Sequence, residues 1–348
     1  MHIQPGVGKE PVMTSDLNTA GHGIAEPELL KEPHWDDSER SPSDVCVAEF
    51  AATHGLRSIA HFSNRFLDFV VRPHGVGRQS PDYGDDEISE AEGRTGGELV
   101  QCFEDFDLAL RPTKTGELMR MVVAAPEGCG LYCGRIKLGL HLVGITRESG
   151  GADHLDFTMN RIITQIRDEF YRLPDEHLGG DRRLSMRPVP SDDGDAFSFD
   201  LAREELKGTA MEVRLNSLWA GFVNYVDLQY AALYRDWSLV CVGDAFDHRK
   251  LGPQFRNIEP GARRALYRDV AQRLRTDIAR LRDIMLPVTT APIDRLVLDV
   301  QEGAVYIHWL GRRTGDFIVG VTMNQELVHV AEQRLRMLAG ELPAEGET

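Results

Sequence analysis

Apolar residues in the first part of the chain recur at helical spacing. The positions that carry this spacing are Leu56, Ile59, Phe62, Phe66, Phe69 and Val70. Intervals of three and four residues place side chains on one face of an α-helix. We therefore expect an amphipathic helix over residues 53–71, ended by Pro73 because proline disfavours helical backbone in the residue before it.

An acidic, glycine-rich stretch follows, and then segments of strand length. Residues 72–98 have the composition of a surface loop. The apolar runs 106–111 and 118–124 are separated by the turn signal "PTKTGE", which is typical of a hairpin. Residues 132–145 are apolar enough for one long strand or for two short strands broken near Gly139, and 158–173 return to helical spacing.

The second part of the chain alternates in the same way. We expect a helix over 216–234, a short buried strand over 238–242 and a long helix over 259–286, with Pro260 in its first turn. A last helix begins at Thr322, where Gln325 completes a capping box. The strand-length runs between these helices are 295–300, 304–310 and 317–322.

One short pattern occurs twice. "LVGIT" at 142–146 resembles "IVGVT" at 318–322, and Thr-Met-Asn occurs both at 158–160 and at 322–324. If the two tripeptides correspond, the first copy carries extra residues between its strand and its helix. Internal duplication is one explanation; chance resemblance between two apolar strands that precede helices is the other, and the sequence leaves both open.

The order of these elements predicts an α+β protein built from two α-β-β-β-α units. Each unit should form a mainly antiparallel sheet covered on one face by amphipathic helices. The expected organisation is a flexible tail at 1–44, a first unit at 45–174 containing the acidic loop 72–98, a connecting region at 175–258 with the helix 216–234, a second unit at 259–340, and a short tail at 341–348.

Composition narrows the classes of partner. The chain has 348 residues and a formal net charge of −16, which argues against a surface that binds nucleic acid or anionic lipid. Double-stranded-RNA-binding domains share the α-β-β-β-α order but need lysines at the start of their last helix, where this chain has Gln325 and Glu326. No apolar run is long enough to span a membrane. We expect a cytoplasmic protein whose five scattered cysteines are reduced, with no metal and no cofactor.

The stretch most like an enzyme site is "SLVCVGDAFDHRK", residues 238–250. Its strand ends at Asp244, and Asp247 and His248 follow, so that two carboxylates and an imidazole share one loop. Metal-dependent hydrolases and nucleotidyl-transferring enzymes place acids at strand ends to hold divalent cations. The alternative, which we favour, is a turn in which Asp244 accepts hydrogen bonds from backbone amides.

Aromatic residues near 219–237 suggest a second kind of site. Most of them share the helical face expected for a core, but aromatic side chains are also enriched at protein interfaces. The interface candidates are Trp219, Tyr225 and Tyr234.

Two functional hypotheses follow. The leading one is a non-enzymatic protein-interaction protein (an adaptor, chaperone-like or assembly protein) that binds a protein partner or forms an oligomer. The rival is a metal-dependent hydrolase or nucleotidyl-transferring enzyme that uses Asp244, Asp247 and His248. Whether the chain is an enzyme stays open, with the pattern favouring the first hypothesis.

Overall fold

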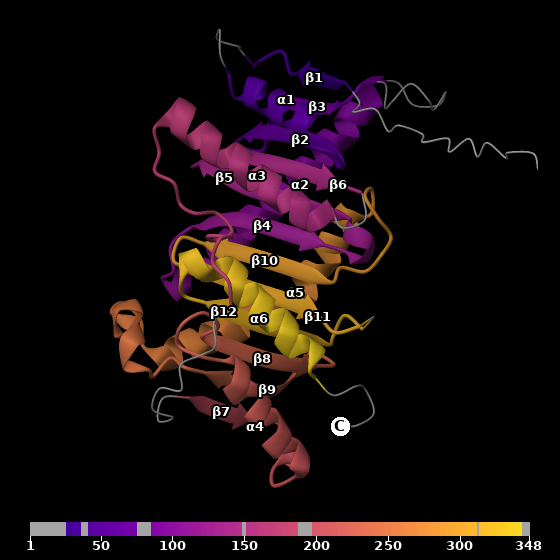
Figure 1. Cartoon of the computed structure of the whole chain (residues 1–348). Coiled ribbons are helices and arrows are strands. Elements are labelled where there is room, and N and C mark those ends of the chain that lie inside the picture. Colours follow the sequence, from indigo (N-terminus) through magenta and orange to yellow (C-terminus); the bar gives the residue numbers. More distant parts are fainter. Residues whose placement is uncertain are drawn as a thin grey trace, which may run out of the picture.

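A single antiparallel sheet of twelve strands forms the centre of the molecule (Figure 1). The computed structural model describes residues 26–35, 41–74, 85–147, 151–186, 197–311 and 313–342. The strand order is β1-β3-β2-β6-β5-β4-β10-β11-β12-β8-β9-β7, and every neighbouring pair is antiparallel. The α+β class and the mainly antiparallel pairing predicted from the sequence are confirmed.

The first half of the sheet comes from the first half of the chain. Its elements are β1 (Pro27–Lys31), α1 (Pro42–Ala52), β2 (Leu56–Ser63), β3 (Phe66–Pro73), α2 (Asp85–Leu110), β4 (Leu118–Ala124), β5 (Gly130–Lys137), β6 (Leu140–Thr146) and α3 (Gly151–Ile166). A π-helical turn, Arg167–Tyr171, continues α3.

The second half of the chain repeats this order of elements. They are β7 (Ser198–Leu201), α4 (Ala210–Phe222), β8 (Tyr230–Arg235), β9 (Ser238–Asp244), α5 (Pro260–Met285), β10 (Arg295–Val300), β11 (Gly303–Trp309), β12 (Phe317–Thr322) and α6 (Val328–Gly340). Read outward from the centre, β4-β5-β6-β2-β3-β1 matches β10-β11-β12-β8-β9-β7. The two halves therefore share one topology and meet where β4 pairs with β10.

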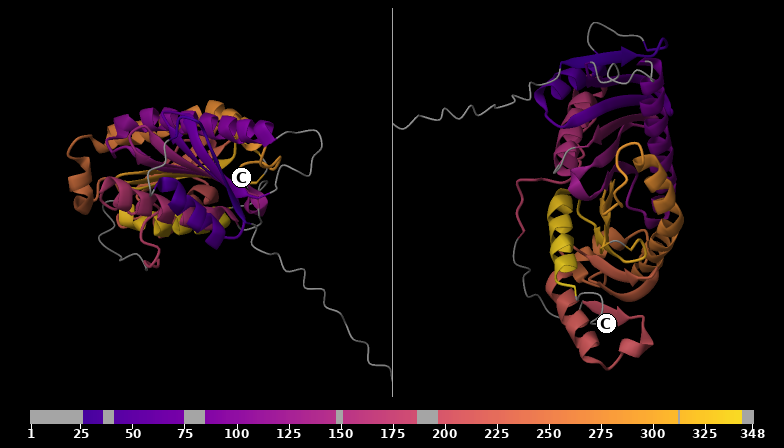
Figure 2. Two further views of the ribbon diagram at one scale, coloured as in Figure 1. Left: turned by 90° about the horizontal axis from the view of Figure 1, so that it is seen from above. Right: turned by 90° about the vertical axis from the view of Figure 1, so that its right-hand side faces the viewer.

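Helices cover both faces of the sheet, not one face as expected (Figure 2). On one face α2 packs beside α5, while α1, α3, α6 and α4 lie on the other. Strands β4, β10 and β11 are buried along their whole length. Because both faces of these strands are apolar, their sequences lack the alternation that marks a strand with one wet face.

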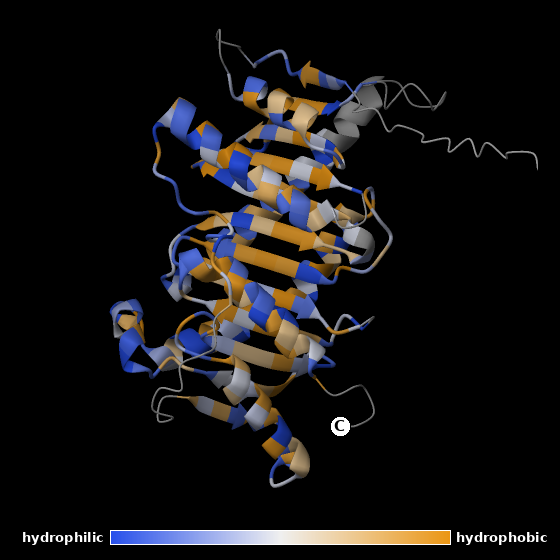
Figure 3. Cartoon of the chain, viewed as in Figure 1, coloured by the Kyte–Doolittle hydropathy of each residue, from blue (hydrophilic) through white to orange (hydrophobic). Residues whose placement is uncertain are grey.

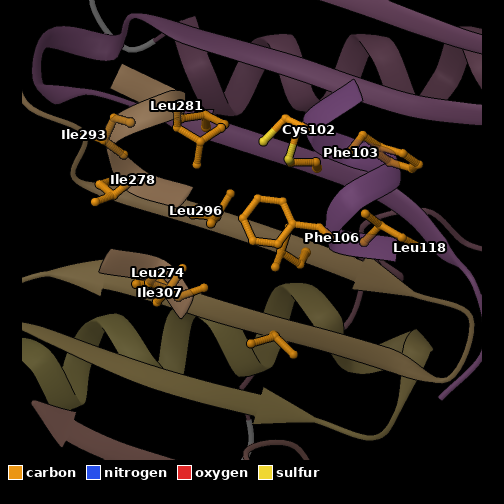
Figure 4. Packing of buried hydrophobic residues seen from close by; sticks show 14 of the residues in the cluster. Cys102, Phe103, Phe106, Leu118, Leu274, Ile278, Leu281, Ile293, Leu296 and Ile307 are labelled. Atoms are coloured by element: carbon orange, nitrogen blue, oxygen red, sulfur yellow. The ribbon is translucent and has the colours of Figure 1, made fainter. Parts of the chain in front are cut away.

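The core under α2 and α5 spans the junction of the halves (Figure 4). Phe103 and Phe106 of α2 and Leu281 of α5 pack toward Leu296 of the central strand β10. Figure 3 shows the complementary pattern, in which the apolar colouring concentrates on the strands while polar residues predominate on the outward faces of the helices. No helix among the described residues is both long and apolar enough to cross a lipid bilayer.

The prediction of a helix over 53–71 is wrong, because this segment forms the hairpin β2–β3. Asn64 and Arg65 form its turn with φ of 50° and 72°, and both strands are largely buried on both faces. The buried side chains of this set therefore come from two paired strands, since burial on both faces removes the two-residue period, while Phe66 beside the turn is exposed.

The prediction of an acidic loop over 72–98 is also wrong for the residues of this range that the structure describes. Residues 85–110 form α2, which also absorbs the strand expected at 106–111. Leu99, Phe103 and Phe106 recur at helical spacing and are buried against the sheet, so tertiary packing outweighs the loop-like composition. Residues 75–84 lie outside the described part of the chain.

The region expected to connect the units, 175–258, contains β7, α4, β8 and β9 of the second half. The helix expected over 216–234 ends at Phe222, because the Asn224 side chain accepts hydrogen bonds from the amides of Val226 and Asp227 and forms a turn. Tyr230 then begins β8.

The tail expected at 1–44 needs revision within the described residues. In the segment 1–44, residues 27–31 form β1 on the edge of the sheet and Pro42 begins α1, while residues 1–25 and 36–40 are outside the described part. At the other end, residues 343–348 of the tail expected at 341–348 are likewise outside it.

The repeated tripeptide is not a structural repeat. Thr158–Asn160 lies inside α3, whereas Thr322 ends β12 and Asn324 caps the short helical turn Gln325–Leu327 before α6. The "LVGIT" and "IVGVT" segments do match, as β6 and β12. Residues 147–150 separate β6 from α3 and residues 323–327 separate β12 from α6, so the first copy does not have the extra loop residues that were expected.

Candidate functional site

The two halves meet about a local two-fold relation at the centre of the sheet. Val122 of β4 lies directly opposite Val297 of β10 in the antiparallel register. Rotation about the midpoint of this pair exchanges Val122 with Val297, Arg120 with Arg295, and Ala124 with Asp299. The side chains of these positions point to the face of the sheet that carries α3 and α6, since residues two apart share a face.

The helices on that face obey the same relation. A Cβ on Gly144 of β6 would lie 2.7 Å from Sδ of Met159 in α3, and a Cβ on Gly320 of β12 would lie 2.7 Å from Cδ2 of Leu335 in α6. Glycine in each strand thus lets the helix approach closely. Met159 and Leu335 therefore occupy corresponding positions. Asp156 lies three residues before Met159 and Glu332 lies three residues before Leu335, so Asp156 of α3 is the counterpart of Glu332 of α6.

We call the part of this face that lies between α3 and α6, over β4 and β10, the junction groove. Its first end holds a buried ion-pair network. Nε of Arg120 donates to Oδ2 of Asp299 over 2.9 Å, and Nη1 of Arg120 donates to Asp156. Burial alone would lower the pKa of Arg120, but the charges of Asp156 and Asp299 outweigh burial and raise that pKa.

The chain fills this end of the groove with its own linker turn, residues 178–182, from the segment between α3 and β7 (Figure 1). The Gly179 amide donates to Oδ2 of Asp299 over 2.8 Å, and Asp181 donates its amide to the Glu326 carbonyl over 2.8 Å. Arg182 adds an ion pair of 2.7 Å to Asp156. A short peptide segment is thus held by carboxylates, backbone and close packing.

The other end of the junction groove is an open pocket of about 360 Å³. The residues that line it are Ala124, Ala125, Pro126, Gly128, Ala152, Asp153, Asp294, Arg295, His308, Trp309 and Arg336. Under the two-fold relation, Arg295 of the pocket corresponds to Arg120 of the filled end, and Ala124 of the pocket corresponds to Asp299 of the filled end. Likewise Ala152, Asp153 and Arg336 of the pocket take the places of Val328, His329 and Asn160.

A second ion-pair network forms one wall of the pocket. Nη1 of Arg295 lies 2.8 Å from Oε1 of Glu332 and 2.6 Å from Oδ1 of Asp153. Arg336 pairs with the same two carboxylates at 2.8 Å and 3.3 Å. Burial would raise the pKa of Glu332, but Arg295 and Arg336 outweigh it and hold that pKa well below its usual range.

Two further titratable residues face the pocket from the ends of β10 and β11. Burial lowers the pKa of His308 to about 4, so its imidazole is neutral near pH 7. Its Nε2 is buried without a hydrogen bond and lies 3.9 Å from Oε1 of Glu332. Burial also raises the pKa of Asp294, with Arg295 opposing that shift.

The polar side chains that line the pocket are two aspartates, two arginines, one histidine and one tryptophan. The described residues that line it include no serine, threonine, cysteine, tyrosine or lysine to act as a nucleophile. Its arginines are already held by carboxylates, so they are preorganised walls of the site.

The predicted enzyme-like loop has a structural role. Nε and Nη2 of Arg264 each donate to one oxygen of Asp244 over 2.7 Å, and Nη2 also reaches Asp247 at 2.5 Å. The Phe246 amide donates to Asp244, as expected for a turn, and His248 stacks on Tyr225 with ring centroids 4.0 Å apart. The carboxylate oxygens that a metal ion would need are thus engaged by a guanidinium.

Of the predicted interface residues, only Tyr225 is partly exposed. Trp219 is fully buried and donates its indole N–H to the Ala231 carbonyl over 2.9 Å. Tyr234 is buried and stacks on Phe317. These two side chains are core residues, and Tyr234 lies in β8 and not in the helix expected over 216–234.

Sequence reasoning did not identify the junction groove, although one signal was present. Arg120 and Asp299 interrupt the apolar runs 118–124 and 295–300, which are the central strands. A charge inside a fully buried strand must be paired, but the sequence does not say with which residue.

Comparison of the chain with known protein families, curated proteins and solved structures finds no match.

Proposed function

We propose that this chain is a non-enzymatic protein-binding protein, of the adaptor, chaperone-like or assembly kind. It would hold a short segment of a protein partner in the open pocket of the junction groove. One observation carries the proposal: the two-fold-related end of the groove already holds a peptide segment, the linker turn, through Gly179 and Asp299.

The form of the pocket supports a peptide ligand. About 360 Å³ lies at the lower end of the range for small-molecule sites. Small side chains at Ala124, Ala125 and Ala152 form its apolar surface, and Trp309 adds an aromatic wall. Such a site has room for a side chain and its neighbouring backbone.

The segment could belong to another protein or to a second copy of this chain. The cytoplasmic location and the exclusion of nucleic acid remain predictions from composition. The rival metal-dependent enzyme has no specific support, because Arg264 engages both oxygens of Asp244.

A selection experiment tests the proposal. The purified full chain is panned against a random dodecapeptide library, and enriched peptides are titrated by calorimetry. Ala152→Leu fills the pocket, Asp153→Leu changes its rim, and Ala210→Leu is the control because Ala210 is exposed at the start of α4. Thermal melts establish that each variant is folded.

We expect enriched peptides to share a motif and to bind both pocket variants at least about tenfold more weakly than the wild type. The Ala210→Leu variant should bind as the wild type does. Absence of enrichment, or binding that neither pocket variant weakens, would contradict the proposal.

A further inference from the structure

Three carboxylates accompany the two arginines of the pocket when Glu332, which contacts both arginines behind the lining, is counted with Asp153 and Asp294. Arg295 and Arg336 form a closed set with Asp153 and Glu332, in which each guanidinium contacts both carboxylates. An anionic ligand would have to displace one of these carboxylates from its partners. Asp294 lies in the same pocket and is the carboxylate left over from this two-against-two arrangement.

Asp294 is only half-buried, which leaves it reachable from the pocket. Partial removal from water nevertheless disfavours its charged form, and the pKa of its carboxyl is raised for this reason. A cation bound beside it would remove that penalty. This is the usual arrangement in which a partly desolvated carboxylate attracts a positive group.

His308 lines the same pocket and is nine-tenths buried. Its Nε2 makes no hydrogen bond within the described part of the chain, is closed off from solvent and lies 3.9 Å from Oε1 of Glu332. Because the imidazole is neutral near pH 7, it adds no positive charge that would repel a cation beside Asp294.

We propose that the open pocket binds a basic side chain, lysine or arginine, of the partner segment, with its cationic group at Asp294 in the pocket that Asp294 shares with the imidazole of His308. The inference rests on the proposed function, because it names the residue class of the segment that the pocket would hold. The ammonium and guanidinium groups offer several donors for the two oxygens of the Asp294 carboxylate.

The charge of the whole chain agrees with this ligand. A net charge of −16 attracts positively charged partners and speeds their association at low ionic strength. The filled end of the groove offers a parallel, since Arg182 of the linker turn pairs there with Asp156.

The test uses a lysine probe too small to depend on peptide context. Nα-acetyl-lysine methylamide is titrated into the full chain and compared with its Nε-acetylated form, which has the same stem but no charge. Binding is followed by NMR through the indole N–H of Trp309, assigned with Trp309→Phe, because Trp309 lines the pocket. Asp294→Asn removes the charge at nearly constant shape.

Asp277→Asn is the matched control. Asp277 is also a half-buried aspartate whose pKa burial raises, but it lies on α5, on the opposite face of the sheet. We expect the charged probe to bind the wild type and Asp277→Asn equally, and Asp294→Asn at least about tenfold more weakly. The acetylated probe should bind all three proteins weakly.

Equal binding of the charged and acetylated probes, or a response of Trp309 that Asp294→Asn leaves unchanged, would overturn the inference. If Asp294→Asn failed to fold, the comparison of the two probes on the wild type would still decide. If the lysine probe did not bind through Asp294 but the peptide library yielded binders of the pocket, the proposed function would stand and only the basic ligand would be refuted. Binding of the charged probe without any peptide selection would instead refute the proposed function alone.

Discussion

Arg120 of β4 donates from Nε to Oδ2 of Asp299 in β10 over 2.9 Å, although the two residues are 179 positions apart in the chain. Both side chains are almost completely buried. The pair crosses the line where the two halves of the sheet meet, and the same carboxylate oxygen of Asp299 accepts the amide of Gly179. One ion pair thus connects both halves and the linker turn.

Arg120→Met should therefore destabilise the protein strongly. The substitution leaves Asp299 buried without its counter-charge and leaves Asp156 with Arg182 as its partner. Breaking a buried pair from one side typically costs about 3–5 kcal/mol. Arg295→Met is the matched control, since Arg336 remains to pair with Glu332 and Asp153 is exposed. Urea unfolding should show a larger loss for Arg120→Met; an equal or smaller loss would refute the assigned role.

Gly180→Ala should loosen the linker turn. A Cβ at Gly180 would lie 2.9 Å from the Glu326 carbonyl oxygen and from the Val328 nitrogen, and its φ is +75°. Gly208→Ala separates backbone strain from steric contact. Gly208 has a similar φ of +73°, but a Cβ placed there would have no atom within 4 Å. We expect the free energy of unfolding of the Gly208→Ala control to fall by about 1–2 kcal/mol, from backbone strain alone.

The Gly180 variant should lose about 1–3 kcal/mol more than the Gly208 variant, because its methyl group meets backbone that cannot move freely. Denaturant unfolding measures both. Equal losses would mean that the linker turn is not tightly held in the groove.

Acid should destabilise the fold through His308. Folding lowers the pKa of His308 from 6.5 to about 4 because the imidazole is buried, so protonation favours the unfolded chain. The free energy of unfolding is then greatest above pH 6.5 and falls as the pH is lowered toward 4, by about 3 kcal/mol at most for this group.

His308→Gln should reduce the loss of stability over that pH range. His154→Gln is the control, because His154 is exposed on α3. Burial also lowers the pKa of His141, to about 3, so some of the loss should persist in the His308 variant. Parallel stability curves for the wild type and His308→Gln would contradict the assignment.

Divalent cations should not stabilise the loop of Asp244, Asp247 and His248. Arg264 already engages both oxygens of Asp244, so a metal ion would have to displace a bidentate guanidinium. We expect thermal melts in Mg²⁺ or Mn²⁺ to match those in chelator. A stabilisation by either ion that Asp244→Ala abolishes would revive the rival enzyme hypothesis.

The sequence by itself determined the class of the fold and much of its second half. The runs 118–124, 295–300 and 317–322 are strands with those bounds, and the helix expected over 259–286 is α5. The break near Gly139, left open between one strand and two, separates β5 from β6. These elements were readable because each has a local pattern that its surroundings do not oppose.

Only the tertiary structure decided which strands pair, and therefore where the site lies. The hairpin β2–β3 and the helix α2 were misread because burial on both sheet faces, or packing against the sheet, overrides local spacing and composition. The pairing of β4 with β10 depends on two segments far apart in sequence, and neither encodes its partner. The junction groove exists only through that pairing, so its charges could be seen in the sequence as unexplained but not assembled into a pocket.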